Sequence, residues 1–188
     1  MSLDQRVVKS LNHWGLHHQW LVKICSNDFV YAAIVIAAVW LLIRVVNLHR
    51  PIQNYKTFIF AVISKGTLIF AIPVGVATVI SELISKFYVR QRPFVGMQGI
   101  KLFVPHSADG GMPSHHMVFM IALITMIYFY NRKLALVLAF LTLISGIARV
   151  AAGIHYPTDI LVGILLGWAV STIYLRITRN HLKAIMRL

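Results

Sequence analysis

Residues 134–177 read LALVLAFLTLISGIARVAAGIHYPTDILVGILLGWAVSTIYLRI, and this stretch decides the fold. Its two apolar runs, 134–151 and 157–177, are each close to the ~20 residues that a helix needs to cross a bilayer. Backbone groups in lipid must be paired within the segment or in a closed barrel, so such long continuous runs predict helices. The stretch therefore predicts two consecutive membrane-spanning helices joined by a short turn.

The rest of the chain continues this pattern. Of its 188 residues, 59% are hydrophobic and 12% are charged, whereas an average soluble domain carries about 25% charged residues. Further apolar runs cover residues 29–46, 57–84 and 114–131. We therefore expect an all-α integral membrane protein in which residues 1–188 form a single domain, a bundle of five transmembrane helices.

The net charge and the apolar content of the chain together indicate which kind of molecule it binds. A net charge of +13 is compatible with nucleic acid binding, but the apolar content argues against nucleic acid and favours the lipid bilayer. A carboxylate-rich metal site is not expected, because the acidic residues number only five: Asp4, Asp28, Glu82, Asp109 and Asp159. The sequence thus predicts no metal and no other cofactor, and it leaves the oligomeric state open.

The distribution of Lys and Arg predicts the orientation of the helices. Cations concentrate in the 44–56 gap, the 131–133 turn and the C-terminal tail, which we assign to the cytoplasmic side of the membrane. The extracytoplasmic side then receives the 85–113 loop and the 152–156 turn. Residues 1–27 alternate apolar and polar groups at helical spacing, which predicts an amphipathic helix or pair of helices in the interface. Whether this segment lies flat, re-enters or spans the bilayer stays open.

The 94–112 part of the long loop contains four glycines and one proline. It is too long for a tight turn, and loops of this length without regular structure are often functional. We therefore expect residues 94–112 to form a cover over a site on the extracytoplasmic side.

Arg149, His155 and Asp159 lie at the turn between the last two apolar runs. Pro157 can occupy the first turn of the next helix, which places His155 just before a helix N-terminus, where free N–H groups favour an anion. Asp159 can accept one ring N–H of His155 and leave the other nitrogen free to attack phosphorus. The alternative is a histidine that only caps a helix beside a structural aspartate.

Two further clusters are expected on the same side. Ser114 can cap a helix or donate to a phosphate, and His116, in the first turn, can protonate a leaving oxygen. Lys86, Arg90 and Arg92 follow a span, and an arginine fork matches two phosphate oxygens. A basic collar that reaches the lipid headgroups is the alternative for these three cations.

In their order along the chain, the three clusters resemble the signature of the type 2 phosphatidic acid phosphatase superfamily, membrane lipid phosphatases related to vanadium haloperoxidases. That signature is K-x6-R-P, then P-S-G-H, then S-R-x5-H-x3-D. The matching positions are Arg92 and Pro93, then Pro113, Ser114 and His116, then Arg149, His155 and Asp159. Three positions depart from it: Lys86 is one residue too close, His115 replaces glycine, and Ala148 replaces serine.

The resemblance implies a role for each matching residue. His155 would be the nucleophile that forms a phosphohistidine, Asp159 would orient it, and His116 would be the general acid. The residues implied to hold the phosphate are Arg92, Arg149, Ser114 and Lys86. With the lysine spacing shortened, either Lys86 or Arg90 can supply the third cation, and the ring of His115 can contact a larger head group. The family requires no metal.

Within the superfamily, Arg-Pro-Phe at 92–94 and Gly-Ile-His-Tyr-Pro at 153–157 resemble the bacterial undecaprenyl pyrophosphate phosphatases of the bacitracin-resistance type. The resemblance implies recycling of a polyprenyl carrier lipid on the outer face of the plasma membrane. A phosphatase of phosphatidic acid or phosphatidylglycerol phosphate is the alternative. A lipid phosphotransferase, a carrier-lipid transporter and a non-catalytic basic scaffold also stay open.

Overall fold

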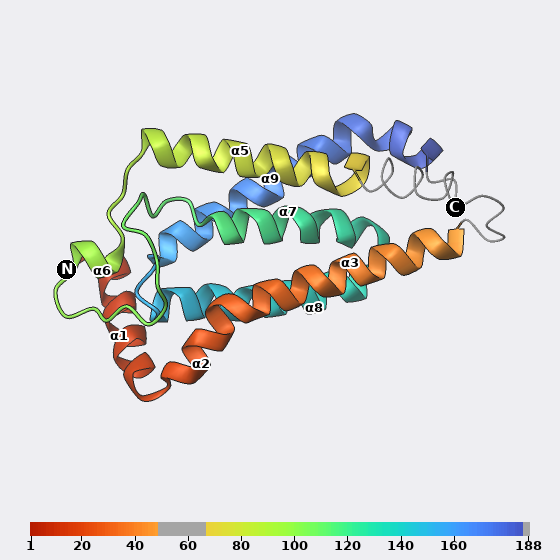
Figure 1. The fold of residues 1–188 in the computed structure, drawn as a ribbon. Coiled ribbons are helices and arrows are strands. Elements are labelled where there is room, and N and C mark those ends of the chain that lie inside the picture. The colour runs from red at the N-terminus through yellow and green to blue at the C-terminus, as the bar shows by residue number, and fades with distance from the viewer. Residues whose placement is uncertain (49–66, 186–188) are drawn as a thin grey trace.

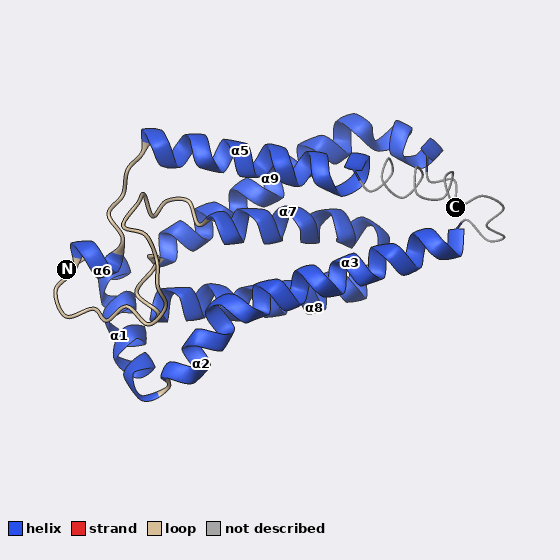
Figure 2. Ribbon diagram, in the orientation of Figure 1, coloured by secondary structure: helices blue, strands red, loops and turns tan. Residues whose placement is uncertain are grey.

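The computed structural model describes residues 1–48 and 67–185. Figures 1 and 2 show helices joined by loops, and the described part of the chain contains no strand. The long helices lie side by side as a bundle and are α3 (Phe29–Leu48), α5 (Ile72–Phe87), α7 (His115–Tyr130), α8 (Arg132–Ala151) and α9 (Pro157–Ile185). The all-α prediction is confirmed for these residues.

The prediction of five similar transmembrane helices is confirmed only in part. Within residues 1–48 and 67–185, four helical stretches are long and apolar enough to cross a membrane: Gln19–Trp40, Ile69–Phe87, Arg132–Ala151 and Pro157–Thr178. The fifth helix, α7, has 16 residues, and at 1.5 Å per residue it is about 24 Å long. The predicted residues 57–66, most of the 44–56 gap and the end of the tail lie outside the described residues.

Residues 1–27, predicted as one or two amphipathic helices, divide into two parts in the structure. Helix α1 (Leu3–His17) is separate and begins with a capping box between Ser2 and Gln5. From Gln19 onward, α2 (Gln19–Lys23) and a π-helical stretch (Ile24–Asp28) lead directly into α3. The apolar stretch that contains α3 therefore begins at Gln19, and only α1 remains as a candidate interfacial helix.

Helix α1 lies across one end of the bundle, which we call the α1 end (Figure 1). Asn12, which is buried, fixes it there. Its Nδ2 donates to the carbonyl oxygens of Lys101 and Ala151, both at 2.8 Å, and its Oδ1 accepts from the backbone N–H of Lys101 at 2.9 Å. One side chain thus ties α1 to the 94–112 loop and to the end of α8.

Helix α7 lies in the centre and packs on α5, α8 and α9. Its approach to α9 depends on two glycines, as the G-x-x-x-G spacing of Gly163 and Gly167 permits. A Cβ at Gly167 would lie 2.5 Å from the carbonyl oxygen of Val118, and a Cβ at Gly163 would lie 2.9 Å from that of Ser114. The glycines therefore bring the N-terminal ends of α7 and α9 together.

The connections at the α1 end gather the predicted clusters. The loop after α5, the short helix α6 (Pro93–Gly96), the 94–112 loop and the α8–α9 turn all lie there, and the α7–α8 turn lies at the opposite end (Figure 1). All three sequence clusters therefore reach the same end of the bundle, as predicted from the alternation of spans.

Candidate active site

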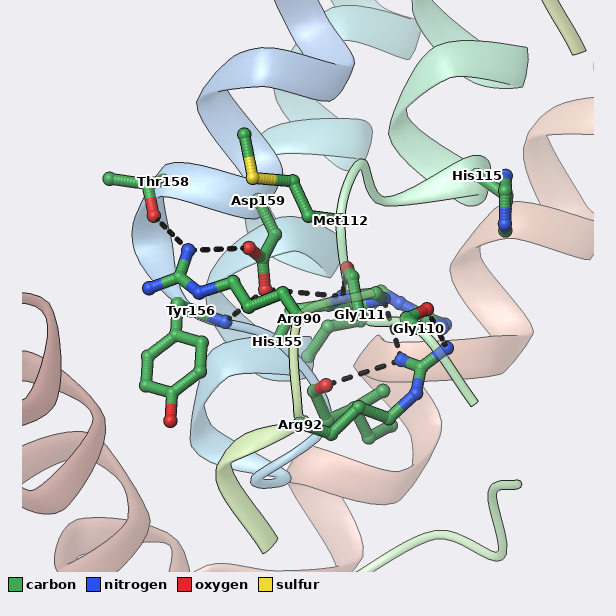
Figure 3. Close-up of polar contacts among 12 residues, drawn as sticks. Arg90, Arg92, Gly110, Gly111, Met112, His115, His155, Tyr156, Thr158 and Asp159 are labelled. Carbon is green, nitrogen blue, oxygen red and sulfur yellow. Dashed lines mark hydrogen bonds and ion pairs between the residues drawn. The ribbon is translucent and has the colours of Figure 1, made fainter. Parts of the chain in front are cut away.

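His155 occupies the turn between α8 and α9 and is 2% exposed. Its Nδ1 lies 2.9 Å from the carbonyl oxygen of Gly111 (Figure 3). A carbonyl oxygen can only accept, so in the neutral ring Nδ1 carries the hydrogen and Nε2 carries the lone pair. Nε2 lies 3.5 Å from Nη1 of Arg92. Burial, together with the charges of Arg149 and Arg92, lowers the pKa of His155 well below its usual value, which keeps this lone pair available.

Asp159 does not make the hydrogen bond to His155 that the sequence suggests. Its Oδ2 lies 3.7 Å from Nδ1 of His155 and instead accepts the backbone N–H of Tyr156 at 2.7 Å. Its Oδ1 accepts from Arg90 at 2.7 Å. The reason is local: Asp159 caps the start of its own helix, and Gly111 takes the ring N–H. Asp159 therefore acts on His155 as a nearby buried charge.

Arg90 is held by carboxylates and is not turned toward a phosphate. Its Nη1 donates to Asp159 and to Thr158 Oγ1 at 2.5 Å, and its Nη2 donates to Asp4 at 2.7 Å. Its guanidinium also lies 4.0 Å from the ring centre of Tyr156. Burial lowers the pKa of Arg90, but its contacts with Asp4 and Asp159 outweigh this and raise the pKa overall. Arg90 thus neutralises the buried carboxylate of Asp159.

Arg92 is 2% exposed and directs its guanidinium toward His155. Its Nη1 donates to the carbonyl oxygen of Ile154 at 3.2 Å. Its Nε and Nη2 donate to Oδ1 of Asp109 at 2.9 and 2.7 Å, and Nη2 also reaches the carbonyl oxygen of Gly110 at 3.3 Å. Asp109, on the 94–112 loop, is 61% exposed. The loop therefore provides Arg92 with a solvent-accessible counterion.

Arg149, near the end of α8, is 1% exposed and pairs with no carboxylate among the described residues. Its Nη1 donates to the carbonyl oxygen of Ser26 at 3.1 Å, and its Nη2 lies 3.5 Å from Nε2 of His106. Its Nε is buried without a hydrogen-bond partner in residues 1–48 and 67–185, and the same holds for Oγ of Ser114. These two buried polar atoms, one on α8 and one at the N-cap of α7, each have unused hydrogen-bonding capacity.

The other predicted site residues divide into two groups. His116 is in the first turn of α7 and is close enough to Arg149, His155 and His106 to interact with their charges. His115 points the other way (Figure 3). Its ring nitrogens contact Ser81 at 2.5 Å and Ser85 at 3.2 Å, both on α5. Successive helical residues point about 100° apart, so a helix that turns His116 to the site turns His115 away.

Lys86 is not brought to the site either. It lies near the end of α5, is exposed, and has no hydrogen bond or ion pair with another described residue. The open question of the third cation thus has a structural answer: Arg90 is bound to carboxylates and Lys86 lies apart. Arg92 and Arg149 are the cations that face His155.

Sequence reasoning missed three contributors. Asp4 is far from the motifs and reaches Arg90 only because α1 crosses the end of the bundle. His106 and Asp109 belong to the 94–112 loop, which was expected to cover a site without any assigned side chain. The only signal for them is the presence of ionisable residues in a loop close to the second motif. Within the described ranges, no three His, Cys, Asp or Glu side chains are grouped as metal ligands would be.

Comparison with known proteins places this geometry in a family. Residues 65–183 match the model of the PAP2 superfamily. The chain is 28% identical over 179 residues to the undecaprenyl-diphosphatase BcrC of Bacillus subtilis, an alignment that covers 93% of this chain and 83% of BcrC.

Two solved structures share the fold. The PAP2-type phosphatidylglycerolphosphate phosphatase from Bacillus subtilis has a TM-score of 0.59 at 15% identity, covering 94% of this chain and 85% of its own. Aquifex aeolicus LpxE has a TM-score of 0.56 at 18% identity, with 83% and 93% covered. With the family model matched over more than half of its length, the chain belongs to the PAP2 superfamily of membrane phosphatases.

Proposed function

We propose that this protein is a metal-independent lipid phosphatase that acts through a phosphohistidine and converts undecaprenyl pyrophosphate to undecaprenyl phosphate. The observation that carries the chemistry is the position of His155 beside two buried guanidinium groups. Its Nε2, with a free lone pair, lies 3.5 Å from Nη1 of Arg92. Arg149, which has no carboxylate partner among the described residues, is close enough for its charge to lower the pKa of His155. A buried charge of this kind is costly unless it is paired, and an arriving phosphate would supply the missing anion.

The first half of the reaction follows from this geometry. Arg92, Arg149 and Ser114 Oγ would hold the oxygens of the phosphoryl group, with help from the N-terminal ends of α7 and α9. Nε2 of His155 would attack phosphorus and form an N–P bond while the bond from phosphorus to the leaving oxygen breaks. His116, if protonated, would give its proton to that oxygen.

In the second half of the reaction, His116 would accept a proton instead of donating one. His116, now neutral, would take a proton from a water molecule as its oxygen attacks phosphorus, and the N–P bond to His155 would break. Inorganic phosphate would leave, and both histidines would return to their starting states. Asp159, held by Arg90, would favour the positive charge that His155 carries while it is phosphorylated.

The choice of substrate has separate support. The alignment with BcrC extends over nearly the whole chain, whereas likeness to the phosphatidylglycerolphosphate phosphatase at 15% identity concerns the fold. Polyprenyl diphosphate is therefore our first choice, and glycerolipid phosphates are the competitors. The site would face the extracytoplasmic side of the plasma membrane, because the turn between α7 and α8 lies at the opposite end of the bundle, with Arg132 and Lys133 at the start of α8.

A substrate panel tests this proposal. The purified protein in detergent with EDTA should release phosphate from undecaprenyl pyrophosphate faster than from undecaprenyl phosphate, phosphatidic acid or phosphatidylglycerol phosphate. His155→Ala should abolish release, while His17→Ala, an exposed histidine on α1, should not. Denatured enzyme quenched during turnover should carry an acid-labile phosphoryl group on His155. Turnover by His155→Ala would refute the mechanism, and preference for a glycerolipid would refute the substrate.

A further inference from the structure

The segment 106–109 of the loop contacts both arginines that face His155. Asp109 accepts two hydrogen bonds from Arg92, and the ring of His106 lies 3.5 Å from Arg149. The ring of His106 also stands edge-on to the ring of His155, with 6.3 Å between their centres. Reacting atoms approach to about 3–3.5 Å before attack, so a tetrahedral phosphoryl group on His155 can reach the ring of His106.

The protonation of His106 is set by its neighbours. Nδ1 lies 3.3 Å from the carbonyl oxygen of Ser107, so in the neutral ring Nδ1 donates and the lone pair of Nε2 faces Arg149. Burial lowers the pKa of His106, and the charges of Arg92 and Arg149 lower it further. Two interactions oppose this: the hydrogen bond to the carbonyl oxygen of Ser107 and the charge of the Asp109 carboxylate each raise the pKa of His106. The ring is therefore neutral when the arginines face no other anion.

His155 and His116 also interact electrostatically with His106. A bound phosphate dianion would change which protonation state of His106 is favoured. It would accept a hydrogen bond from Nη2 of Arg149 and outweigh the two guanidinium charges, so that an imidazolium becomes favourable. Protonated Nε2 then donates, and the nearest new acceptor is an oxygen of the phosphate.

We propose that His106 is a further catalytic residue, which takes up a proton from water when the phosphate binds and donates a hydrogen bond from Nε2 to a phosphate oxygen. This inference rests on the proposed function, because it assumes that Arg92 and Arg149 bind the phosphoryl group. It adds a substrate contact from the loop. His106 thereby serves binding, whereas His116, on α7, serves proton transfer to the leaving oxygen.

Binding of inorganic phosphate is a test that needs no turnover. Calorimetric titrations in two buffers of different ionisation enthalpy give the number of protons taken up, and at about pH 8 free phosphate is already mostly the dianion. The wild-type protein should take up more protons per phosphate than His106→Ala and His106→Gln. Equal uptake in the wild type and both variants would overturn the proposal.

Kinetics give the second measurement. Loss of one charge-assisted hydrogen bond should raise KM for the lipid substrate roughly tenfold or more, with kcat changed much less. His106→Gln keeps a donor and should recover part of the affinity without the proton uptake. His17→Ala is the matched control, and thermal unfolding checks that the loop variants fold. A fall in kcat without a rise in KM would contradict a binding role.

These outcomes separate the two proposals. If phosphate binds with proton uptake that depends on His106 but none of the lipids is hydrolysed, the proposed function fails and the phosphate contact stands. If undecaprenyl pyrophosphate is hydrolysed and the His106 variants match the wild type in uptake and KM, the proposed function stands and the role of His106 is refuted.

Discussion

Asp159→Asn is the substitution whose effect the structure specifies in most detail. In the wild type the carboxylate is fully buried, lies 3.7 Å from Nδ1 of His155, and makes no hydrogen bond to that ring. The tautomer of His155 is instead fixed by the carbonyl oxygen of Gly111 at 2.9 Å. Asparagine removes the charge and leaves this contact intact. The variant thus isolates the electrostatic contribution of Asp159 to the positive phosphorylated imidazole.

The size of that contribution can be worked from the distances. Two unit charges about 4 Å apart interact by about 4 kcal/mol at an effective dielectric constant near 20. Arg90 lies 2.7 Å from the other carboxylate oxygen and offsets part of the negative charge. If half remains, the loss is about 2 kcal/mol, which corresponds to a roughly 30-fold slower formation of the phosphoenzyme.

Rapid-quench measurement of phosphoenzyme formation is the appropriate assay, with rates expressed per folded molecule after thermal unfolding. Asp4→Asn is the control, because it removes the other carboxylate from Arg90 without approaching His155. Two opposite results would each contradict this electrostatic role of Asp159. A rate within about twofold of wild type would remove the electrostatic role, and a loss near 10⁴-fold, the size found where an aspartate sets the tautomer, would show that Gly111 does not fix it.

Three further outcomes are expected. Gly167→Ala should lower thermal stability in detergent by about 1–3 kcal/mol, because the added Cβ would lie 2.5 Å from the carbonyl oxygen of Val118. Gly75→Ala is the control, since a Cβ added there would meet no neighbour within 4 Å. Equal unfolding midpoints for the two variants would contradict the close packing at Gly167. Ser114→Ala should weaken phosphate binding without lowering the unfolding midpoint, since its Oγ has no described partner to lose; a lower midpoint would reveal one. Although burial alone would raise the pKa of Asp4, hydrogen bonds from Thr158 and Arg90 lower it below 3.8. The stability that Asp4 adds over Asp4→Asn is therefore full above that value and should decline as the pH falls further, and a growing difference in acid would contradict this sign.

Hydropathy was sufficient to predict most of the long helices, because a long apolar run in lipid has few ways to pair its backbone groups. α8 and α9 follow the predicted runs closely. The start of the first apolar stretch was not predictable in this way. Residues 19–28 are polar enough to read as interfacial, and only the continuous helical path from Gln19 into α3 assigns them to that stretch.

The candidate site, like the helices, could be predicted from the sequence only in part. Motif order predicted that Arg92, His116 and His155 meet, and the structure brings them to one end of the bundle. Spacing could not tell that His115 faces α5, because that depends on the rotation of α7 about its axis. Nor could it reveal Asp4, whose contact with Arg90 spans 86 positions of sequence. Side-chain partners across such separations are set by packing between helices, which a single sequence does not encode locally.

The three arginines near His155 differ in how far their charge is compensated, and this difference assigns their roles. Arg90 contacts two carboxylates, Asp4 and Asp159, so a phosphate would have to compete with both. Arg92 contacts one, the exposed Asp109, which water can readily solvate if a phosphate displaces it. Arg149 contacts none among the described residues and is 1% exposed. A buried guanidinium gains most from an anion when it has no other.

The affinity for phosphate should therefore depend most on Arg149, then on Arg92, and least on Arg90. Lysine keeps the charge but loses the planar fork. Substitution by lysine should therefore raise the dissociation constant of inorganic phosphate most at residue 149, less at residue 92 and least at residue 90. A larger effect at residue 90 than at residue 149 would mean that the carboxylates release Arg90 when phosphate binds. The family motif specifies no residue at position 90, and the compensation of charge is the physical property that distinguishes the two cases.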